Sequence, residues 1–214
     1  MKRFAYLSMT FLCMGVSLYA AGVYGLLPLG KLLHPEMRAT FNAHALAVYT
    51  HVFAAIFALA LGPLQFSARL RATRPRVHRW LGRLYLGVGV AIGGAAGLYM
   101  ASFAFGGPVA RVGFSLLALA WLYTGWRAYA AIRRRDVAAH RKWMVRNFAL
   151  TLAAVTLRIY LPLSMVAGLP FESAYVAIAW LCWMPNLLVA EAWLRRDRAS
   201  VAERKRAAEV ALAA

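Results

Sequence analysis

The sequence predicts an all-α bundle of six transmembrane helices with both termini in the cytoplasm. Of its 214 residues, 63% are hydrophobic and 15% are charged, whereas a soluble domain usually carries about 25% charged residues. Several apolar runs of roughly 20 residues are each long enough to cross a hydrocarbon core of about 30 Å. The net charge of +18 is concentrated in two internal loops and the C-terminal stretch. The positive-inside rule places those segments in the cytoplasm.

The hydropathy pattern divides the chain into six spans followed by a tail. We expect the spans near residues 5–27, 42–66, 80–105, 110–132, 144–168 and 173–194. The first apolar run exceeds the roughly 7–15 apolar residues of a cleaved signal peptide, so we interpret it as a retained helix. Residues 1–195 then form one membrane domain, and residues 196–214 form a basic cytoplasmic tail.

The distribution of charged residues and cysteines narrows the possible partners. Arg-rich loops facing the cytoplasm are expected to contact anionic lipid headgroups. Nucleic-acid binding requires a basic surface with aromatic stacking platforms, which the segments outside the membrane lack. Cys13 and Cys182 lie in the first and last spans without a Cys-x-x-Cys pair, which predicts buried free thiols. The sequence motifs of common soluble enzymes are absent, so enzymatic activity stays open.

The second span carries two histidines on a stripe of small residues. His44 and His51 are seven residues apart, so both rings leave the same face of a helix. This face continues through alanines and a glycine to Gln65. In lipid, such a stripe is expected to face the bundle interior, a cofactor or water. With His34 in the preceding loop, the two histidines also offer three ligands for zinc as an alternative.

The fifth span carries a second polar stripe on one helix face, formed by His140, Asn147, Thr151 and Arg158. Arg158 lies about nine residues, or roughly 14 Å, from the outer end of its span, at the expected depth of His51. The sequence offers no carboxylate at that depth. We expect His51 and Arg158 to line a pocket for a haem propionate, a quinone carbonyl or a lipid phosphate. The alternative is a guanidinium that bonds to helix carbonyls.

A second pair of histidines lies at the cytoplasmic ends of the third and fifth spans. His78 and His140 are predicted as axial ligands of one b-type haem, because imidazoles on two facing helices commonly hold haem iron in bundles. His78 leads into a face with Gly82, Tyr85, Gly89 and Gly93. These glycines either leave room for a flat macrocycle or serve close helix packing.

Five motifs in order carry a family resemblance: HALAVYTH, GPLQF, RPRVHRWLGRLY, AAHRKWMVR and LRIYLP. They resemble the bacterial membrane proteins grouped as domain of unknown function 2306, over about residues 42–165. This resemblance implies an inner-membrane protein and brings no established activity. A more distant resemblance is to the cytochrome b-561 superfamily, which places a histidine pair on spans three and five. The fourth span of this chain has no histidine, so the likeness implies at most one haem.

Together these features predict a multi-pass inner-membrane protein that is redox-associated and binds one b-type haem or a quinone. A carrier or channel for a small anionic or lipidic substrate, built on the Arg158 stripe, is the first alternative. A scaffold or assembly factor is the second alternative. Its contact face would be the small-residue series Gly89, Gly93 and Gly97, which would also suit a homo-oligomer.

Overall fold

The computed structural model describes residues 3–197, and this part of the chain is a bundle of helices without strands. Six helical segments are long and apolar enough to cross a membrane. They are Arg3–Leu26, Ala45–Gln65, Pro75–Ala101, Gly107–Arg133, Val137–Val166 and Phe171–Asp197. The predicted all-α, six-span fold is confirmed. Residues 198–214, most of the predicted basic tail, lie outside the described residues.

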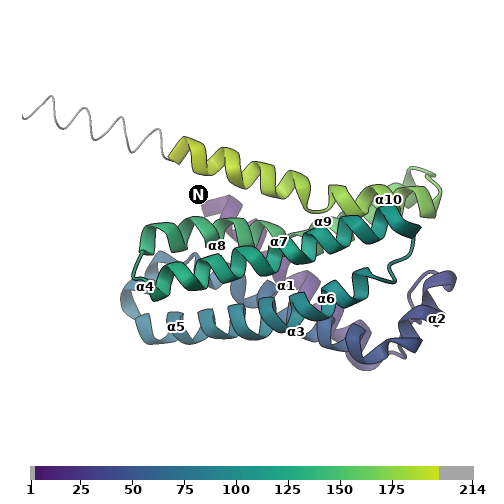
Figure 1. Cartoon of the computed structure of the whole chain (residues 1–214), viewed down its shortest axis with the longest axis horizontal. Helices are drawn as coiled ribbons and strands as arrows, with labels where there is room; N and C mark the ends of the chain where they lie inside the picture. The colour runs from purple at the N-terminus through teal and green to yellow at the C-terminus, as the bar shows by residue number, and fades with distance from the viewer. Residues whose placement is uncertain (1–2, 198–214) are drawn as a thin grey trace, which may run out of the picture.

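The spans run side by side along the long axis of the molecule (Figure 1). The first is α1 (Arg3–Leu26), the second α3 (Ala45–Gln65) and the fourth α7 (Gly107–Arg133). The third span joins α5 (Pro75–Leu84), the π-helix η1 (Tyr85–Ile92) and α6 (Gly93–Ala101). The fifth joins α8 (Val137–Thr151) and α9 (Ala153–Val166), and the sixth begins with α10 (Phe171–Leu181). The Arg-rich links before α5 and α8 lie at the same end of the bundle as the end of the sixth span (Figure 1).

Two short helices outside the spans are absent from the sequence-based assignment. α2 (Pro35–Ala43) lies at the end opposite the Arg-rich links, and α4 (Ala68–Thr73) lies within one of these links. The side chain of Ser67 caps α4 by accepting a hydrogen bond from the Leu70 amide at 3.2 Å. Both helices are too short and too polar to give a hydropathy signal.

The third and fifth spans begin earlier than predicted, at Pro75 and Val137 instead of residues 80 and 144. Proline suits the first position of a helix because its missing amide hydrogen would have had no partner there. Asp136 caps the fifth span by accepting a hydrogen bond from the Ala139 amide at 2.8 Å. Hydropathy marks only the hydrocarbon core, so it misses these basic first turns. His78 and His140 therefore lie on helices rather than in loops.

Two spans are interrupted by turn residues. The fifth span breaks at Leu152, between α8 and α9. The sixth span is interrupted by a turn at Cys182 and Trp183, just before Pro185. Proline has no amide hydrogen to donate to the carbonyl four residues earlier, and its ring clashes with that carbonyl. Both effects explain this turn. The break at Leu152, by contrast, has no proline within a turn of it.

The glycine series of the third span packs against α3. A Cβ on Gly89 would lie 2.7 Å from the Cβ of Ala58, and one on Gly97 would lie 2.8 Å from Nδ1 of His51. A Cβ on Gly93 would lie 3.2 Å from the Cβ of Ala54. This face is used for close packing inside the bundle, so it offers neither room for a flat macrocycle nor a contact face for a scaffold.

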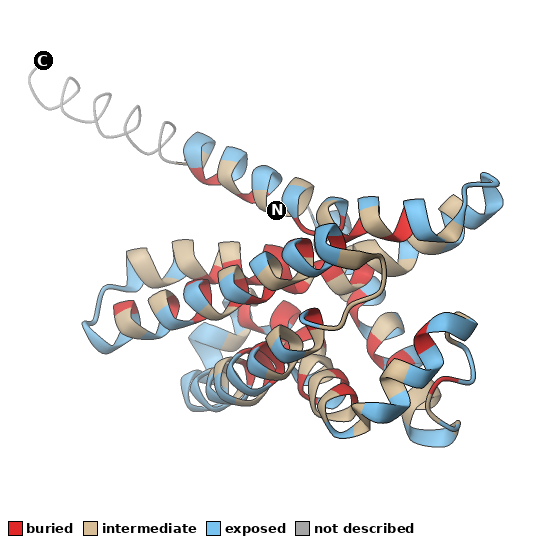
Figure 2. Ribbon diagram, turned by 45° about the vertical axis from the view of Figure 1, so that its right-hand side comes forward, coloured by how far each residue is buried: buried red, intermediate tan, exposed pale blue. Residues whose placement is uncertain are grey.

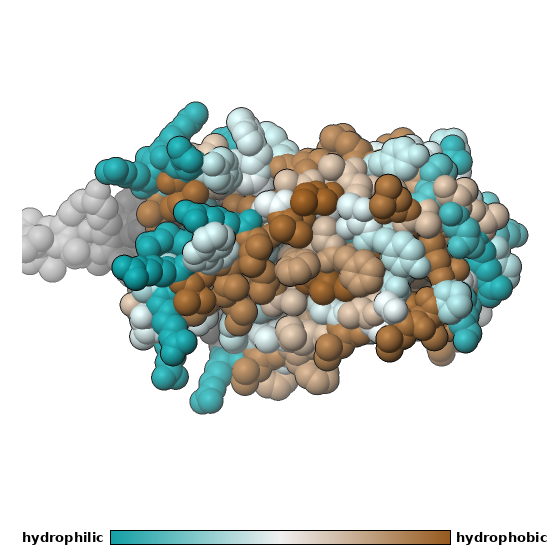
Figure 3. Space-filling model, turned by 90° about the horizontal axis from the view of Figure 1, so that it is seen from below, coloured by the Kyte–Doolittle hydropathy of each residue, from teal (hydrophilic) through white to brown (hydrophobic). Residues whose placement is uncertain are grey.

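Burial follows the expected pattern for a membrane bundle. Buried residues gather on the faces where the helices meet, and exposed residues lie around the outside (Figure 2). Many of these exposed residues are large and apolar. In surface view, hydrophobic residues dominate the middle and hydrophilic residues gather at the two ends (Figure 3). Cys13 and Cys182 are free and buried, as predicted.

Candidate functional site

The faces of the third and fifth spans that carry His78 and His140 point toward each other. The two side chains lie close enough to interact electrostatically. Seven residues deeper along each helix, the hydroxyl of Tyr85 donates a hydrogen bond to Oδ1 of Asn147 at 2.7 Å. Seven residues make almost two helical turns, so each deeper residue shares the face of its histidine. The structure therefore brings together the histidine pair that the sequence proposed.

The surroundings of the pair include polar atoms without a partner. Nδ1 of His140 lies 2.9 Å from the carbonyl oxygen of Ala128. The other ring nitrogen of His140, Nε2, takes no part in this contact. Nδ1 of His78 and Nε2 of Gln65 are buried, and no described residue forms a hydrogen bond with either atom. The Gln65 side chain lies beside Gly82, one helical turn from His78, with Oε1 3.2 Å from the point where a glycine Cβ would be. Orphaned buried polar atoms indicate a missing partner.

Arginines add positive charge around His78. Arg71 and Arg79 both lie close enough to His78 to affect it electrostatically. Nη1 of Arg71 also donates a 2.9 Å hydrogen bond to the backbone oxygen of Gln65. The end of the bundle that holds the histidine pair is therefore suited to a group with acidic or carbonyl oxygens.

A buried hydrogen-bond network lies directly inside the histidine pair. Tyr85 and Asn147 are both fully buried, at 0% exposure. The Tyr85 hydroxyl is also 2.9 Å from Oγ1 of Thr151, which accepts a hydrogen bond from the Trp121 indole at 2.9 Å. Nδ2 of Asn147 donates to the Trp121 carbonyl at 2.8 Å and to Oγ1 of Thr124 at 2.9 Å. The network joins η1, α7 and α8.

The sequence analysis identified part of this network and missed the rest. It placed Asn147 and Thr151 on the polar stripe of the fifth span, but it gave no role to Trp121 or Thr124. Those two polar groups lie three residues apart on the fourth span, and therefore on one helix face. The sequence analysis placed Tyr85 on the face that follows His78, at the same spacing as Asn147 from His140, without linking the two residues.

His51 and Arg158 are also brought together, in the other half of the bundle. The two side chains interact electrostatically. Nδ1 of His51 lies 2.8 Å from the carbonyl oxygen of Gly93. Nη1 of Arg158 donates a 3.0 Å hydrogen bond to the carbonyl of Ala154, and its guanidinium carbon lies 6.0 Å from the centre of the Tyr19 ring. Arg158 thus has the helix-carbonyl partner that the sequence left as the alternative to a ligand.

The other two histidines, His34 and His44, lie in aromatic surroundings. His44 immediately precedes α3, and its ring stacks on Phe103 with 4.1 Å between the ring centres. Its Nδ1 also forms a 3.1 Å hydrogen bond with the Tyr99 hydroxyl. His34 stacks on Phe171 at 4.2 Å. Within residues 3–197, no group of three or more His, Cys, Asp or Glu side chains converges as a metal site. The zinc alternative built on the three outer histidines is therefore wrong.

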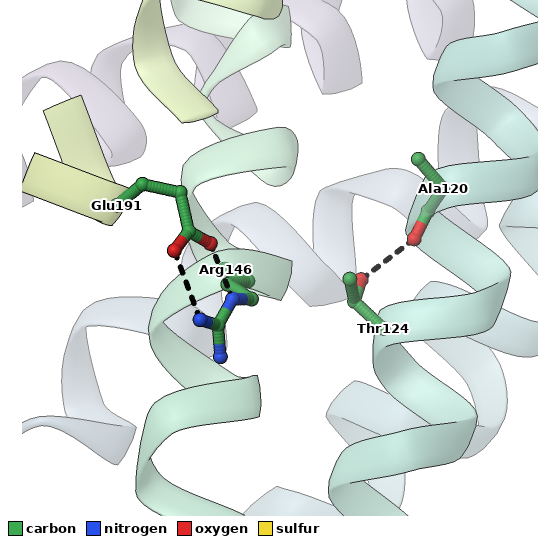
Figure 4. A network of polar contacts seen from close by, with 4 residues as sticks. All are labelled: Ala120, Thr124, Arg146 and Glu191. Carbon is green, nitrogen blue, oxygen red and sulfur yellow. Dashed lines mark hydrogen bonds and ion pairs between the residues drawn. The ribbon is translucent and has the colours of Figure 1, made fainter. Parts of the chain in front are cut away.

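An ion pair links the fifth and sixth spans near the Arg-rich end. The guanidinium of Arg146 donates to both carboxylate oxygens of Glu191, through Nε to Oε1 and through Nη2 to Oε2, the latter at 2.9 Å (Figure 4). The same close-up shows Thr124 bonded to the carbonyl of Ala120, one turn earlier on α7. The ion pair was not predicted from the sequence.

With this geometry in place, comparison with known proteins gives the family. A family model described as a predicted membrane protein, DUF2306, matches residues 48–194. The chain belongs to the DUF2306 family. The region that matches DUF2306 contains the four candidate residues His51, His78, His140 and Arg158, and it leaves out His44. No curated protein and no solved structure is significantly similar to this DUF2306 member. The comparisons lend no support to the cytochrome b-561 likeness.

Proposed function

We propose that this multi-pass DUF2306 protein is redox-associated and holds one b-type haem between His78 and His140, in the bacterial inner membrane. The observation that carries the proposal is the pairing of the two helix faces through Tyr85 and Asn147. His78 and His140 lie almost two helical turns nearer the end of the bundle on these faces, within range of electrostatic interaction. The Arg-rich links at that end match the charge of an anionic cytoplasmic leaflet.

The donor set fits haem in two respects. Metal-bound histidines usually engage their second ring nitrogen with a carbonyl or carboxylate, as His140 does with Ala128. His78 differs from this pattern, because its buried Nδ1 has no such partner among the described residues. Arg71 supplies positive charge near the pair, which propionate groups require. When bound, the haem would supply one-electron transfer, and the protein would set the orientation of its ligands. The deeper glycines pack on α3, and Gln65 lies against Gly82, so binding haem would require the Gln65 side chain to move aside.

Absorption spectra test the haem proposal directly. Protein purified from haem-replete cells should show a Soret band, with sharp α and β bands after reduction by dithionite. His78→Ala and His140→Ala should each lose these bands while remaining monodisperse by size-exclusion chromatography. His34→Phe is the matched control, because it preserves the stacking on Phe171 at the opposite end and should leave the spectrum unchanged. A featureless wild-type spectrum would overturn the haem assignment.

A quinone is the second candidate, favoured by the orphaned polar atoms. Nε2 of Gln65 is a hydrogen-bond donor that no iron ligand set requires, whereas a quinone carbonyl accepts from such a group. Nδ1 of His78 can donate to the same kind of oxygen in the appropriate tautomer. A quinone head also needs less room than a macrocycle.

Extraction of purified, haem-free protein tests the quinone candidate. Retention of endogenous quinone above the level in a detergent–lipid blank would support it. Gln65→Leu and His78→Leu should then lose the quinone, and His34→Phe should keep it. If the wild-type protein holds neither haem nor quinone, the redox proposal fails for this site.

A further inference from the structure

A cavity of about 400 Å³ opens on α8 away from the histidine pair. It is lined by Asp136, Ala138, Ala139, Lys142, Trp143 and Arg146. At 100° per residue, the centre of this lining lies roughly 100° around the helix from the face that carries His140 and Asn147. The cavity is therefore separate from the candidate haem site, and no function described above uses it.

Cations and an indole dominate the walls of this cavity. Two guanidinium groups pack over Trp143, with the Arg127 carbon 4.5 Å and the Arg146 carbon 4.7 Å from its ring centre. Arg127 comes from α7, so the stack also joins two spans. Nearby on the same helix, Arg141 lies 5.9 Å from the ring of Trp193 on the sixth span. Such alternation of cations and indoles is typical of the membrane–water interface.

The positive charge of the cavity is only partly compensated. Glu191 engages Nε and Nη2 of Arg146, so Nη1 remains as a donor on that guanidinium. Asp136 is committed to capping α8 through the Ala139 amide. Lys142 is half-buried, and no carboxylate of residues 3–197 lies within ion-pair distance of it. Lys142 and Arg146 are four residues apart, and like charges at this spacing repel each other. An anion between them would relieve this repulsion.

The depth of the cavity indicates the source of that anion. The fifth span has 30 residues, from Val137 to Val166. Its length of about 45 Å exceeds a hydrocarbon core of about 30 Å, so its first turns lie among the lipid headgroups. Lys142 is the sixth residue of this span and Arg146 the tenth. Their side chains lie near the boundary between headgroups and hydrocarbon, where lipid phosphates are concentrated.

We propose that this cavity binds the phosphate headgroup of an anionic glycerophospholipid. The ammonium of Lys142 and Nη1 of Arg146 donate to the phosphate, and the indoles of Trp143 and Trp193 contact the glycerol and upper acyl chains. Glu191 holds the guanidinium in place, so that its free edge faces the cavity. The proposal does not depend on whether haem or quinone binds at the histidine pair.

Native mass spectrometry of the full chain in detergent tests this site. The probes are dioleoyl phosphatidylglycerol and dioleoyl phosphatidylcholine at equal concentration. Wild-type protein should retain one phosphatidylglycerol in preference to phosphatidylcholine. Lys142→Gln should lower the affinity for phosphatidylglycerol about five-fold, the effect of removing one cation near a headgroup. Lys142→Arg should keep most of it.

Arg83→Gln is the matched control, because Arg83 is an exposed cation beside Trp80 at the same end of the bundle and outside the cavity. Its affinity for phosphatidylglycerol should stay at the wild-type value. An equal loss in Arg83→Gln and Lys142→Gln would show a diffuse charge effect and overturn the site. Equal retention of both lipids by the wild type would also overturn it. Displacement of the lipid by millimolar inorganic phosphate would assign the cavity to a soluble anion instead.

Discussion

The hydroxyl of Tyr85 illustrates how a polar side chain is accommodated inside a membrane bundle. It is fully buried, yet it contacts Oδ1 of Asn147 and Oγ1 of Thr151 at hydrogen-bond distance. Burying such a group without a partner would cost several kcal/mol in a medium free of water. The partners come from α8, so the network offsets this cost only when the third and fifth spans are correctly aligned. It thus selects one register of these spans.

Removing the hydroxyl tests the contribution of this network. Tyr85→Phe should lower the free energy of unfolding by about 1–2 kcal/mol, since hydrogen bonds between membrane helices average about 0.6 kcal/mol and reach about 1.7 kcal/mol. Reversible unfolding in mixed micelles, followed by circular dichroism, measures the change. Tyr129→Phe is the control, because that exposed hydroxyl bonds only to Arg133 on its own helix. Similar small losses in both variants would mean that the network contributes little.

At the scale of helices, glycine positions decide how closely the third span approaches α3. Gly89 and Gly87 both lie in η1. A Cβ on Gly89 would come within 2.8 Å of the backbone nitrogen of Ala58, whereas a Cβ on Gly87 meets nothing within 4 Å. The backbone cannot move aside as a flexible side chain does. Substituting alanine at each glycine therefore separates the effect of packing from the effect of helix propensity.

Alanine at these two positions should have opposite effects. Gly89→Ala should lower the free energy of unfolding by about 1–3 kcal/mol, the usual cost of overpacking. Gly87→Ala should leave it unchanged or raise it by up to about 1 kcal/mol, through better helix propensity. Thermal melts in detergent, with matched protein-to-detergent ratios, rank the variants. Equal stability of the two variants would contradict the packing of η1 on α3.

Hydropathy predicts some features of the helices and misses others. All six spans could be predicted, because apolar runs of membrane-spanning length have few alternatives. The starts at Pro75 and Val137 could not be placed by hydropathy, since their first turns are basic. The π-helix η1 depends on how the third span fits against α3, and that is a tertiary contact. Helix boundaries in the headgroup region are better signalled by caps, as Asp136 shows.

For the molecule as a whole, hydropathy indicated which candidate residues lie at similar depth, but it did not indicate what surrounds them. His78 and His140, and likewise His51 and Arg158, are pairs that matched depth suggested and the structure brings together. Hydropathy gives depth but not helix order. The partner of Arg158, a carbonyl on its own helix, was therefore only one alternative. The filling of the glycine face by α3 could not be foreseen, because it depends on which helix is adjacent.

The charge asymmetry of the bundle predicts its orientation in the membrane. The links before α5 and α8 and the end of the sixth span share one end (Figure 1). Cytoplasmic loops retain positive charge, so we predict that this end is cytoplasmic. The link between α6 and α7, which contains Gly106, lies one span away from the link at Arg135. Alkaline phosphatase is active only after export, so reporter fusions at these two positions distinguish the two orientations.

A phosphatase fused after Gly106 should be active, and one fused after Arg135 should be inactive. Green fluorescent protein at the same positions should give the opposite pattern, which controls for differences in expression. The reverse result at both positions would invert the orientation and place the His78–His140 pair on the outer side of the membrane. Electron exchange at that pair would then require a donor outside the cytoplasm. Orientation thus decides which soluble redox partners can reach the candidate site.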